Sequence, residues 1–350
     1  MSAIITEKFR QHNATQFFES FSEASKSTYY LFVGKATAYT SGTTGGSDSS
    51  PPTPSDSPTD TEFYAWDSML AAKNVTSSDI TYAIPRRAWA NGTTYDMYDD
   101  NISSSNTTTS GASNLYDSTF YFMTSDYRVY KVLDNNGGTA YSGAEPTSTS
   151  TSPFELGGYV LKYMYQVTTS EAAKYLTSDF IPVSDDSAVS TAAVDGKIES
   201  IKVTAGTGYT NGTYYAAIYG DGTSAGTSSG GIIRITVSGN AIQSFGLTAG
   251  TDTTIHAGGA GYTFGTVNLG SGYTFSDSGL TSASNMSGSG GAIEVVISPK
   301  NGHGNSSIVE LGGHYVMSAT TLTQAENDDI TTSNDFRQVG LVVDPTNYGT

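Results

Sequence analysis

The sequence predicts a mainly β fold with a few short helices (α+β), organised as antiparallel β-sandwich domains with a Gly-rich β-repeat module inserted. The first supporting observation is composition: 39 Gly and 24 Tyr accompany abundant Ser and Thr, while only 14% of residues are charged. Long surface helices normally carry many Glu and Lys residues, which are scarce here. The second is a set of short segments in which apolar and polar residues alternate between turns, as is typical of strands. The third is an internal repeat in the glycine-rich part.

Length and charge limit the functions that this chain can have. With 350 residues it can form two or three domains. A formal charge of −17, from 16 basic and 33 acidic residues, argues against sequence-independent DNA binding, which depends on cationic contacts to phosphate. The count of 0 Cys excludes disulfides and thiol catalysis. We see neither a secretory signal nor an apolar run long enough to span a membrane, so we expect a soluble product made in a cytoplasm.

Two helices are expected near the N-terminus. Asn13 is the predicted cap of the first, over residues 14–24. Its apolar stripe consists of residues spaced three and four apart, Ala14, Phe17, Phe18 and Phe21. Thr59 or Asp60 is the predicted cap of the second. One face of that second helix would carry Phe63, Trp66, Asp67 and Leu70.

Strands are expected in the first half of the chain. The runs that predict them lie at residues 29–33, 120–123, 127–133 and 159–167. In the last run, apolar residues alternate with Lys162 and Gln166, which indicates one buried and one solvated face. The sequence Asn-Asn-Gly-Gly at 135–138 supplies the positive φ angles that a tight turn requires.

An internal repeat marks the glycine-rich part of the chain. Each copy contains two strand-like blocks and a Gly-Tyr-Thr turn between them, so neither copy can bury its apolar face well alone. We therefore predict a β sandwich or paired-sheet module made of two packed copies. The three matching pairs of blocks are 198–207 with 242–251, 208–213 with 261–266, and 231–237 with 291–297.

The segment Ile-Pro-Arg-Arg-Ala-Trp at residues 84–89 is the most informative one, because paired arginines beside Pro and Trp are unusual in a chain so poor in basic residues. Its upstream neighbours are residues 4–10, Phe17-Phe18, residues 30–34, residues 58–60 and Trp66. In this order and at these spacings they resemble the baseplate wedge subunit family of T-even-type contractile-tailed bacteriophages, a dimeric wedge protein. The resemblance returns at residues 300–304, 310–317 and 335–345.

This resemblance implies a structural protein of the virion, located in the tail baseplate and assembled in the host cytoplasm. It implies a homodimer that contacts other wedge proteins, with no enzymatic activity, cofactor, nucleic acid or membrane insertion. The chain would divide into an N-terminal α+β part of the wedge core (1–112), a β domain (113–194), the inserted Gly/Tyr-rich module (195–300) and a return to the wedge core (301–350). Family chains continue with a last β segment, so here that segment is absent or the sequence is partial.

Five side chains are the candidates for interface contacts. Arg86 and Arg87 beside Trp89 can bind carboxylates in a bidentate manner or stack on an aromatic ring, and arginine is a preferred interface anchor. The alternative for this pair is an internal salt bridge within the subunit. Trp66 and Arg337 complete the set, because both lie in segments that carry the resemblance.

The residues that could carry catalysis or bind metal show no informative spacing. The histidines are few and scattered, so we expect His303 and His314 to be held by backbone contacts rather than by a metal. Asp96, Asp99 and Asp100 lack the spacing of a calcium loop, and we expect them in solvated loops. No catalytic, cofactor or metal residue is therefore assigned.

The predicted function follows from the resemblance. We expect a structural component of the baseplate wedge, which mediates assembly with other wedge proteins and takes part in baseplate rearrangement during infection. The alternative is a surface-exposed glycan-binding or adhesion module of a virion. It is motivated by the glycine- and tyrosine-rich repeat, because tyrosines on β loops commonly stack on sugars.

Overall fold

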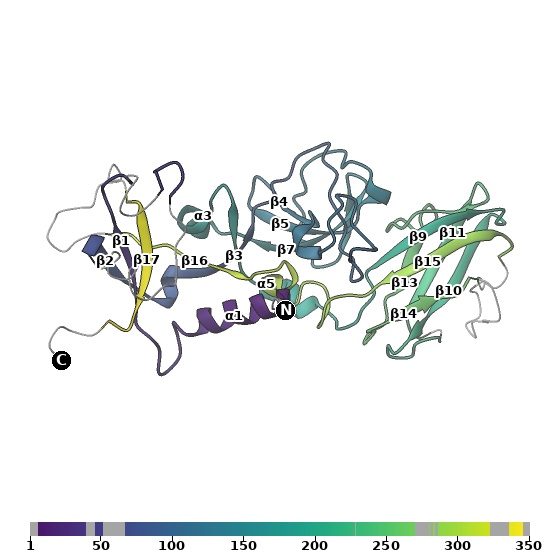
Figure 1. The fold of residues 1–350 in the computed structure, drawn as a ribbon. Coiled ribbons are helices and arrows are strands. Elements are labelled where there is room, and N and C mark those ends of the chain that lie inside the picture. Colours follow the sequence, from purple (N-terminus) through teal and green to yellow (C-terminus); the bar gives the residue numbers. More distant parts are fainter. Residues whose placement is uncertain are drawn as a thin grey trace. The chain divides into compact units, whose positions relative to one another are not determined.

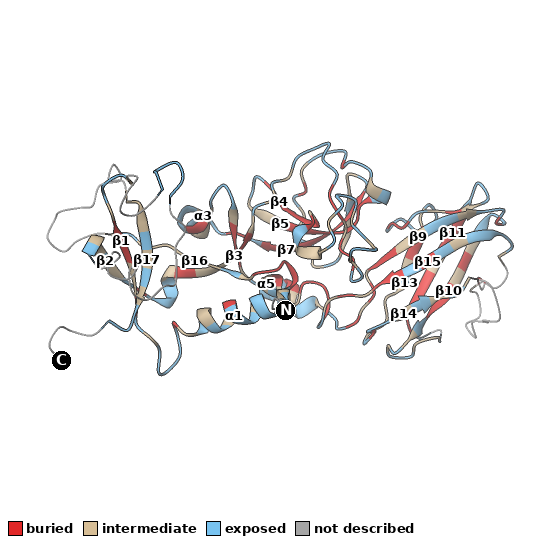
Figure 2. Ribbon diagram, in the orientation of Figure 1, coloured by how far each residue is buried: buried red, intermediate tan, exposed pale blue. Residues whose placement is uncertain are grey.

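The computed structural model describes residues 6–39, 46–51, 67–227, 229–269, 280, 283, 286–322 and 336–345. The chain forms two compact units, which we describe separately: residues 1–83 with 314–350, and residues 84–313. Strands dominate both, and the ladders described below are antiparallel (Figure 1). Buried residues are concentrated in these strands (Figure 2). The prediction of a mainly β fold with a few short helices is therefore confirmed.

In its described residues the first unit contains a three-stranded sheet, a second strand pair, an α-helix and the short 3-10 helix η1 (Ser77–Asp79). The sheet order is β17-β1-β2, and β16 pairs with the part of β3 that lies in this unit. Phe17 and Phe18 of the helix pack with Phe21, Tyr29 and other apolar residues in a small core. The elements are α1 (Glu7–Glu19), β1 (Tyr29–Gly34), β2 (Met69–Val75), β3 (Ile80–Pro85), β16 (Tyr315–Ser318) and β17 (Gln338–Val343).

Both helix predictions need correction. The first helix begins at Glu7 rather than after Asn13, because the Thr6 side chain accepts a hydrogen bond from the Phe9 N–H and caps it. The apolar stripe was right, but the helix starts earlier and ends at Glu19. Residues 59–66 of the second predicted helix lie outside the described residues. Leu70, expected on its apolar face, lies instead in strand β2 and is exposed.

The second unit begins with a sheet of order β4-β5-β7-β6. Its strands confirm the predictions for residues 120–123, 127–133 and 159–167, and positive φ angles at Asn136, Gly137 and Gly138 confirm the predicted turn. The elements of this part are η2 (Leu115–Asp117), β4 (Tyr121–Met123), β5 (Arg128–Asp134), η3 (Asn136–Gly138), β6 (Phe154–Leu156), β7 (Tyr159–Gln166), α3 (Thr169–Tyr175), β8 (Phe180–Val183), α4 (Ser187–Ala192) and α5 (Ser307–Glu310).

The two faces of this sheet differ in chemistry. One face carries a tyrosine-rich core that includes Tyr130, Val132 and Leu161. On the other face Lys131 of β5 lies directly opposite Lys162 of β7, and both side chains are buried. The predicted solvated face of β7 is therefore wrong: seven of its eight residues are buried. A later part of the chain covers this face.

The glycine-rich insert forms a sheet that nearly closes into a barrel. The strand order is β12-β11-β10-β14-β15-β9, β13 also pairs with β11, and β12 contacts β9. Isoleucines and valines fill its interior, and Leu133 and Val160 from the preceding sheet pack into the same core. Its strands are β9 (Ser200–Thr207), β10 (Gly212–Gly220), β11 (Ile232–Ser238), β12 (Ala241–Ile242), β13 (Thr254–Ala257), β14 (Gly265–Val267) and β15 (Ser289–Val296).

The two copies of the repeat hold each other reciprocally. Tyr209 of the first copy accepts a hydrogen bond from Gly291 N–H of the second, at 3.0 Å. Tyr262 of the second copy accepts one from Gly231 N–H of the first, also at 3.0 Å. An added Cβ at Gly291 would lie 2.5 Å from the Tyr209 hydroxyl, so this close approach requires glycine.

One block of the predicted repeat has a different counterpart. Residues 242–251 resemble β9 in sequence, yet only their first residue lies in a strand, β12. The structural counterpart of β9 is β13, because Ala292 pairs with Thr204 as Ile232 pairs with Ala257. The repeat is present in the structure. In each copy the first strand pairs with the last strand of the other copy, because β9 pairs with β15 and β13 pairs with β11.

Candidate functional site

The predicted interface segment begins where β3 ends. The Arg86 N–H donates to Asp179 O at 2.7 Å, and Arg86 Nη1 donates to Thr177 O at 2.8 Å. The Arg86 residue is nevertheless exposed. The hydrogen bond to Thr177 O thus holds the guanidinium, and the side chain remains accessible to another protein.

Arg87 points into its own subunit. Its Nη2 donates to Tyr116 O at 2.8 Å, and its guanidinium carbon lies 4.3 Å from the centre of the Tyr121 ring. Burial lowers the pKa of this guanidinium, while nearby Tyr121 and two aspartates oppose the shift. Among the described residues neither Arg86 nor Arg87 forms an ion pair with a carboxylate. The stacking expected of Arg87 is therefore found inside the subunit.

Trp89 is half-buried beside the same sheet. The backbone N–H of Trp89 donates to Met123 O at 2.8 Å, and the backbone N–H of Met123 donates to Arg87 O at 2.7 Å. Its ring meets the edge of Tyr141 at 5.9 Å. Within the described part of the chain, the buried indole Nε1 has no hydrogen-bond acceptor.

The remaining two candidates are in the first unit. Arg337 Nε lies 2.9 Å from Asp48 Oδ1, and its Nη1 donates to Ala36 O at 2.8 Å. The Tyr39 N–H and the Arg337 guanidinium both lower the pKa of Asp48. Trp66 lies outside the described residues. The structure thus gathers Arg86, Arg87 and Trp89 in one segment, while Arg337 belongs to the other unit.

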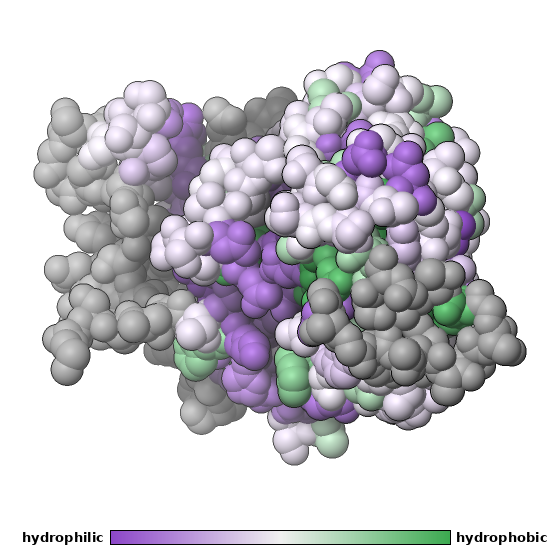
Figure 3. Space-filling model, turned by 90° about the vertical axis from the view of Figure 1, so that its right-hand side faces the viewer, coloured by the Kyte–Doolittle hydropathy of each residue, from purple (hydrophilic) through white to green (hydrophobic). Residues whose placement is uncertain are grey.

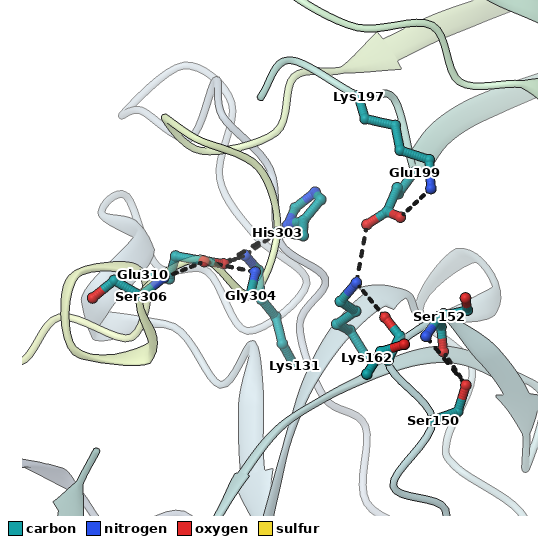
Figure 4. A network of polar contacts seen from close by, with 11 residues as sticks. Lys131, Ser150, Ser152, Lys162, Lys197, Glu199, His303, Gly304, Ser306 and Glu310 are labelled. Carbon is teal, nitrogen blue, oxygen red and sulfur yellow. Dashed lines mark hydrogen bonds and ion pairs between the residues drawn. The ribbon is translucent and has the colours of Figure 1, made fainter. Parts of the chain in front are cut away.

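A buried charge network on the lysine face of the β5–β7 sheet was not predicted (Figure 4). Lys131 Nζ lies 2.6 Å from Glu310 Oε2 and 2.7 Å from His303 Nδ1. The other Glu310 oxygen accepts the Gly304 N–H at 2.7 Å. Burial lowers the pKa of both Lys131 and His303. Lys131 donates a hydrogen bond to Nδ1 of His303. The His303 ring must therefore be neutral, because a protonated imidazole has no acceptor nitrogen.

The second lysine is neutralised separately. Lys162 Nζ donates to Thr151 O at 2.8 Å and lies 3.5 Å from Glu199 Oε2, and Lys197 lies 2.9 Å from the other Glu199 oxygen (Figure 4). Two lysines directly opposite each other would repel, so each needs its own carboxylate. Glu199 opens the barrel insert and Glu310 follows it. The network therefore fastens both ends of the insert to the sheet.

Sequence reasoning assigned some of these residues wrongly. His303 is held by the Lys131 side chain, not by the backbone. Asp96 and Asp99 are buried rather than solvated. Burial raises the pKa of Asp96, but hydrogen bonds from Ser110 and Thr119 outweigh it, and the net pKa is lowered. A usable signal existed for the network, since a lysine inside an otherwise apolar strand such as β5 requires a partner.

The arrangement is suited to holding chain segments together rather than to chemistry. In the described part of the chain, no group of three or more His, Asp or Glu residues could hold a metal ion. No helix there is long and apolar enough to cross a membrane. The buried lysines are fully engaged by internal partners, whereas Arg86 and Ala88 of the segment 84–89 are exposed.

Comparison with known families shows that the segment 84–89 lies within a region that matches a family. Residues 3–144 match the model of a family described as Bacteriophage T4, Gp8. That family is a T4 baseplate wedge protein family. The resemblance to the baseplate wedge subunit family is therefore confirmed over these residues, and it supports a structural role in the wedge. No curated protein matches the chain. The Gp8 match includes the segment 84–89, with Tyr116 and Tyr121 that hold Arg87, and stops before the barrel.

Proposed function

We propose that this chain is a structural component of the tail baseplate wedge of a contractile-tailed bacteriophage. In this role it joins other wedge proteins by extended contacts and takes part in the rearrangement of the baseplate during infection. It acts as a homodimer, works without catalysis, and is assembled in the host cytoplasm. The observation that carries this proposal is the match of residues 3–144 to the Gp8 family.

The geometry of the segment 84–89 supports a contact role. Arg86 is exposed and anchored through backbone carbonyls, so its position is fixed before a partner arrives. Pre-organisation of this kind lowers the entropic cost of association. Arg87 holds the segment against Tyr121 and is a supporting residue. We assign Arg86 and Trp89 to the interface on these grounds, and propose Trp66 and Arg337 as contacts of the first unit.

An assembly experiment tests the proposal. The full chain is mixed with the other wedge proteins of its phage, and complexes are followed by size-exclusion chromatography with light scattering. Wild type is expected to form a dimer of about twice its 36.6 kDa mass and to enter a wedge complex. Failure to associate with any wedge protein would contradict the proposed function.

A matched pair of variants sharpens this test. Arg86→Glu is expected to weaken wedge association at least tenfold, because the replacement puts a negative charge where a fixed donor fork stood. Lys174→Glu makes the same charge change at an exposed position of α3, outside the residues that match the family and outside the segments that carry the resemblance. Equal association of both variants would remove Arg86 from the interface.

Two tyrosines of the repeat that motivated the glycan-binding alternative are buried in the barrel, whereas Tyr219 of the same module is exposed. Tyr209 and Tyr262 are 5% and 2% exposed, and their hydroxyls are used within the barrel. The barrel surface in Figure 3 is mostly pale, with small scattered hydrophobic areas in its described part. Tyr209 and Tyr262 therefore stabilise the barrel and do not form a binding face.

A further inference from the structure

A cavity lies within the second unit, where three stretches of chain meet. Its walls come from the loop within residues 97–109, the end of β5 with its turn at 134–137, and barrel residues at 202–203 and 244–245. Its volume of about 310 Å³ falls at the lower end of the range of small-molecule sites. The barrel insert completes this cavity, because the sheet supplies only part of the wall.

The wall combines two kinds of surface. Hydroxyl and amide side chains supply hydrogen-bond donors and acceptors from several directions. These polar residues are Asn106, Thr107, Thr108, Thr109, Asn135 and Ser244. Apolar side chains supply the remaining surface, namely Met97, Ile102, Val203 and Phe245. A ligand that fits this wall must present both polar groups and an apolar face.

The charges of the cavity restrict the ligand further. Lys202 is paired with Asp99, so its positive charge is already neutralised. Asp134 is 9% exposed and accepts the Asn136 N–H at 2.8 Å, and in the described part of the chain it has no ion-pair partner. Burial raises the pKa of Asp134 to about 6. A carboxylate that is buried without a counter-ion costs stability, and such groups are retained where they serve a function.

We propose that this cavity binds one unit of a neutral saccharide. A sugar ring has hydroxyls around its edge and C–H groups on its faces, which matches a wall of hydroxyl, amide and carboxylate groups beside apolar side chains. Asp134 accepts hydrogen bonds from two neighbouring hydroxyls of the sugar. The Asp99–Lys202 pair and Asn106 orient the ring, and Phe245 with Val203 contacts its apolar face.

Other ligand classes fit less well. Phosphates and acidic sugars need an unpaired cation, and the lysine of this cavity is already paired. A purely apolar ligand would leave the buried carboxylate of Asp134 facing it without a new partner. The proposal goes beyond the wedge role and stands independently of it, because wedge association and sugar binding are measured separately.

Binding is measured on the full chain by saturation-transfer NMR and titration calorimetry. The panel contains glucose, galactose, mannose, rhamnose, N-acetylglucosamine and N-acetylgalactosamine, with glucose 6-phosphate, N-acetylneuraminic acid and putrescine as charged comparators. At least one neutral sugar is expected to bind. Asp134→Asn and Ser244→Trp, which fills the mouth of the cavity, are each expected to raise its Kd at least tenfold.

Asp126→Asn is the matched control. It makes the same change in a separate, more open hollow lined by residues 125–128 and 166–169, and is expected to leave the Kd unchanged. The proposal is overturned if no neutral sugar binds wild type, if a charged comparator binds in preference, or if Ser244→Trp binds as well as wild type. Thermal unfolding of each variant establishes that it is folded.

Discussion

The β4–β7 sheet and the barrel are both antiparallel, yet they are held together in different ways. The sheet buries tyrosines on one face and two lysines on the other, and the lysines depend on Glu199 and Glu310, which are distant in sequence. The barrel buries isoleucine and valine, and its copies are joined by tyrosine hydroxyls and glycines that recur at equivalent positions. The sheet therefore depends on long-range charge pairing, whereas the barrel depends on a repeated local device.

The difference shows how an inserted domain can fold within a longer chain. A repeated unit that closes on itself brings its own core and needs few contacts outside. This barrel still shares Leu133 and Val160 with the sheet, and both of its ends are tied to the buried lysines. The sheet and the barrel thus share core residues and ion pairs at their junction. Four measurements test this difference between the sheet and the barrel.

The largest effect is expected in the charge network of the sheet. Glu310→Gln removes the charge that faces buried Lys131, and we expect a loss of about 3 kcal/mol in the free energy of unfolding. The measurement is urea denaturation at pH 7. Asp126→Asn, which breaks a surface pair with Arg128, is the control and should cost less than about 1 kcal/mol. Equal losses would show that the buried Lys131–Glu310 pair stabilises the protein no more than the surface pair does.

The second effect concerns Asp134 and depends on pH. Burial raises its pKa in the folded protein to about 6, from the ordinary value of 3.8. Because the folded state favours the protonated form, this group destabilises the protein above pH 6, and that cost disappears as pH falls through 6 towards 4. Asp134→Asn should therefore stabilise the protein by about 2 kcal/mol at pH 8 and by almost nothing at pH 4. Denaturation of both proteins at the two pH values tests this, and a pH-independent difference would contradict it.

A third, smaller effect tests the reciprocal contacts of the barrel. Tyr209→Phe leaves the Gly291 N–H without its acceptor and should cost about 1 kcal/mol. Tyr262→Phe should cost more, about 2 kcal/mol, because the Tyr262 hydroxyl also donates to Ile218 O at 3.2 Å. Thermal and chemical unfolding of both variants gives the comparison. A larger loss in Tyr209→Phe than in Tyr262→Phe would contradict this order.

The smallest effect is expected for the exposed Arg86, and the half-buried Arg87 serves as its comparator. Arg86→Glu removes one hydrogen bond from an exposed side chain to Thr177 O and should change the free energy of unfolding by less than about 0.5 kcal/mol. Arg87→Ala should cost more than about 2 kcal/mol, since it leaves the face of Tyr121 and the Tyr116 carbonyl without their partner. Urea denaturation of the pair separates a contact residue from a supporting one. A large loss in Arg86→Glu would give that residue a structural role.

Local patterns predicted much of the second unit. Apolar runs located β4, β5 and β7, and the Asn-Asn-Gly-Gly sequence located the turn after β5. The first helix was misplaced because Asn13 was given the capping role that Thr6 performs. Of the candidate interface residues, Arg86 is exposed as an interface requires, but the internal ring that holds Arg87 belongs to β4 and could not be foreseen. The division into four domains stays a prediction.

The amino-acid sequence alone located strands β1, β4, β5 and β7, the glycine turn after β5, the repeat and the resemblance of the first part to the wedge family. All of these depend on neighbouring residues or on order along the chain. Only the tertiary structure decided that Lys131 and Lys162 are buried, that β13 rather than residues 242–251 matches β9, and that a cavity forms beside Asp134. Burial and pairing between distant segments depend on which surfaces meet after folding, and alternation within one strand cannot show what covers its second face.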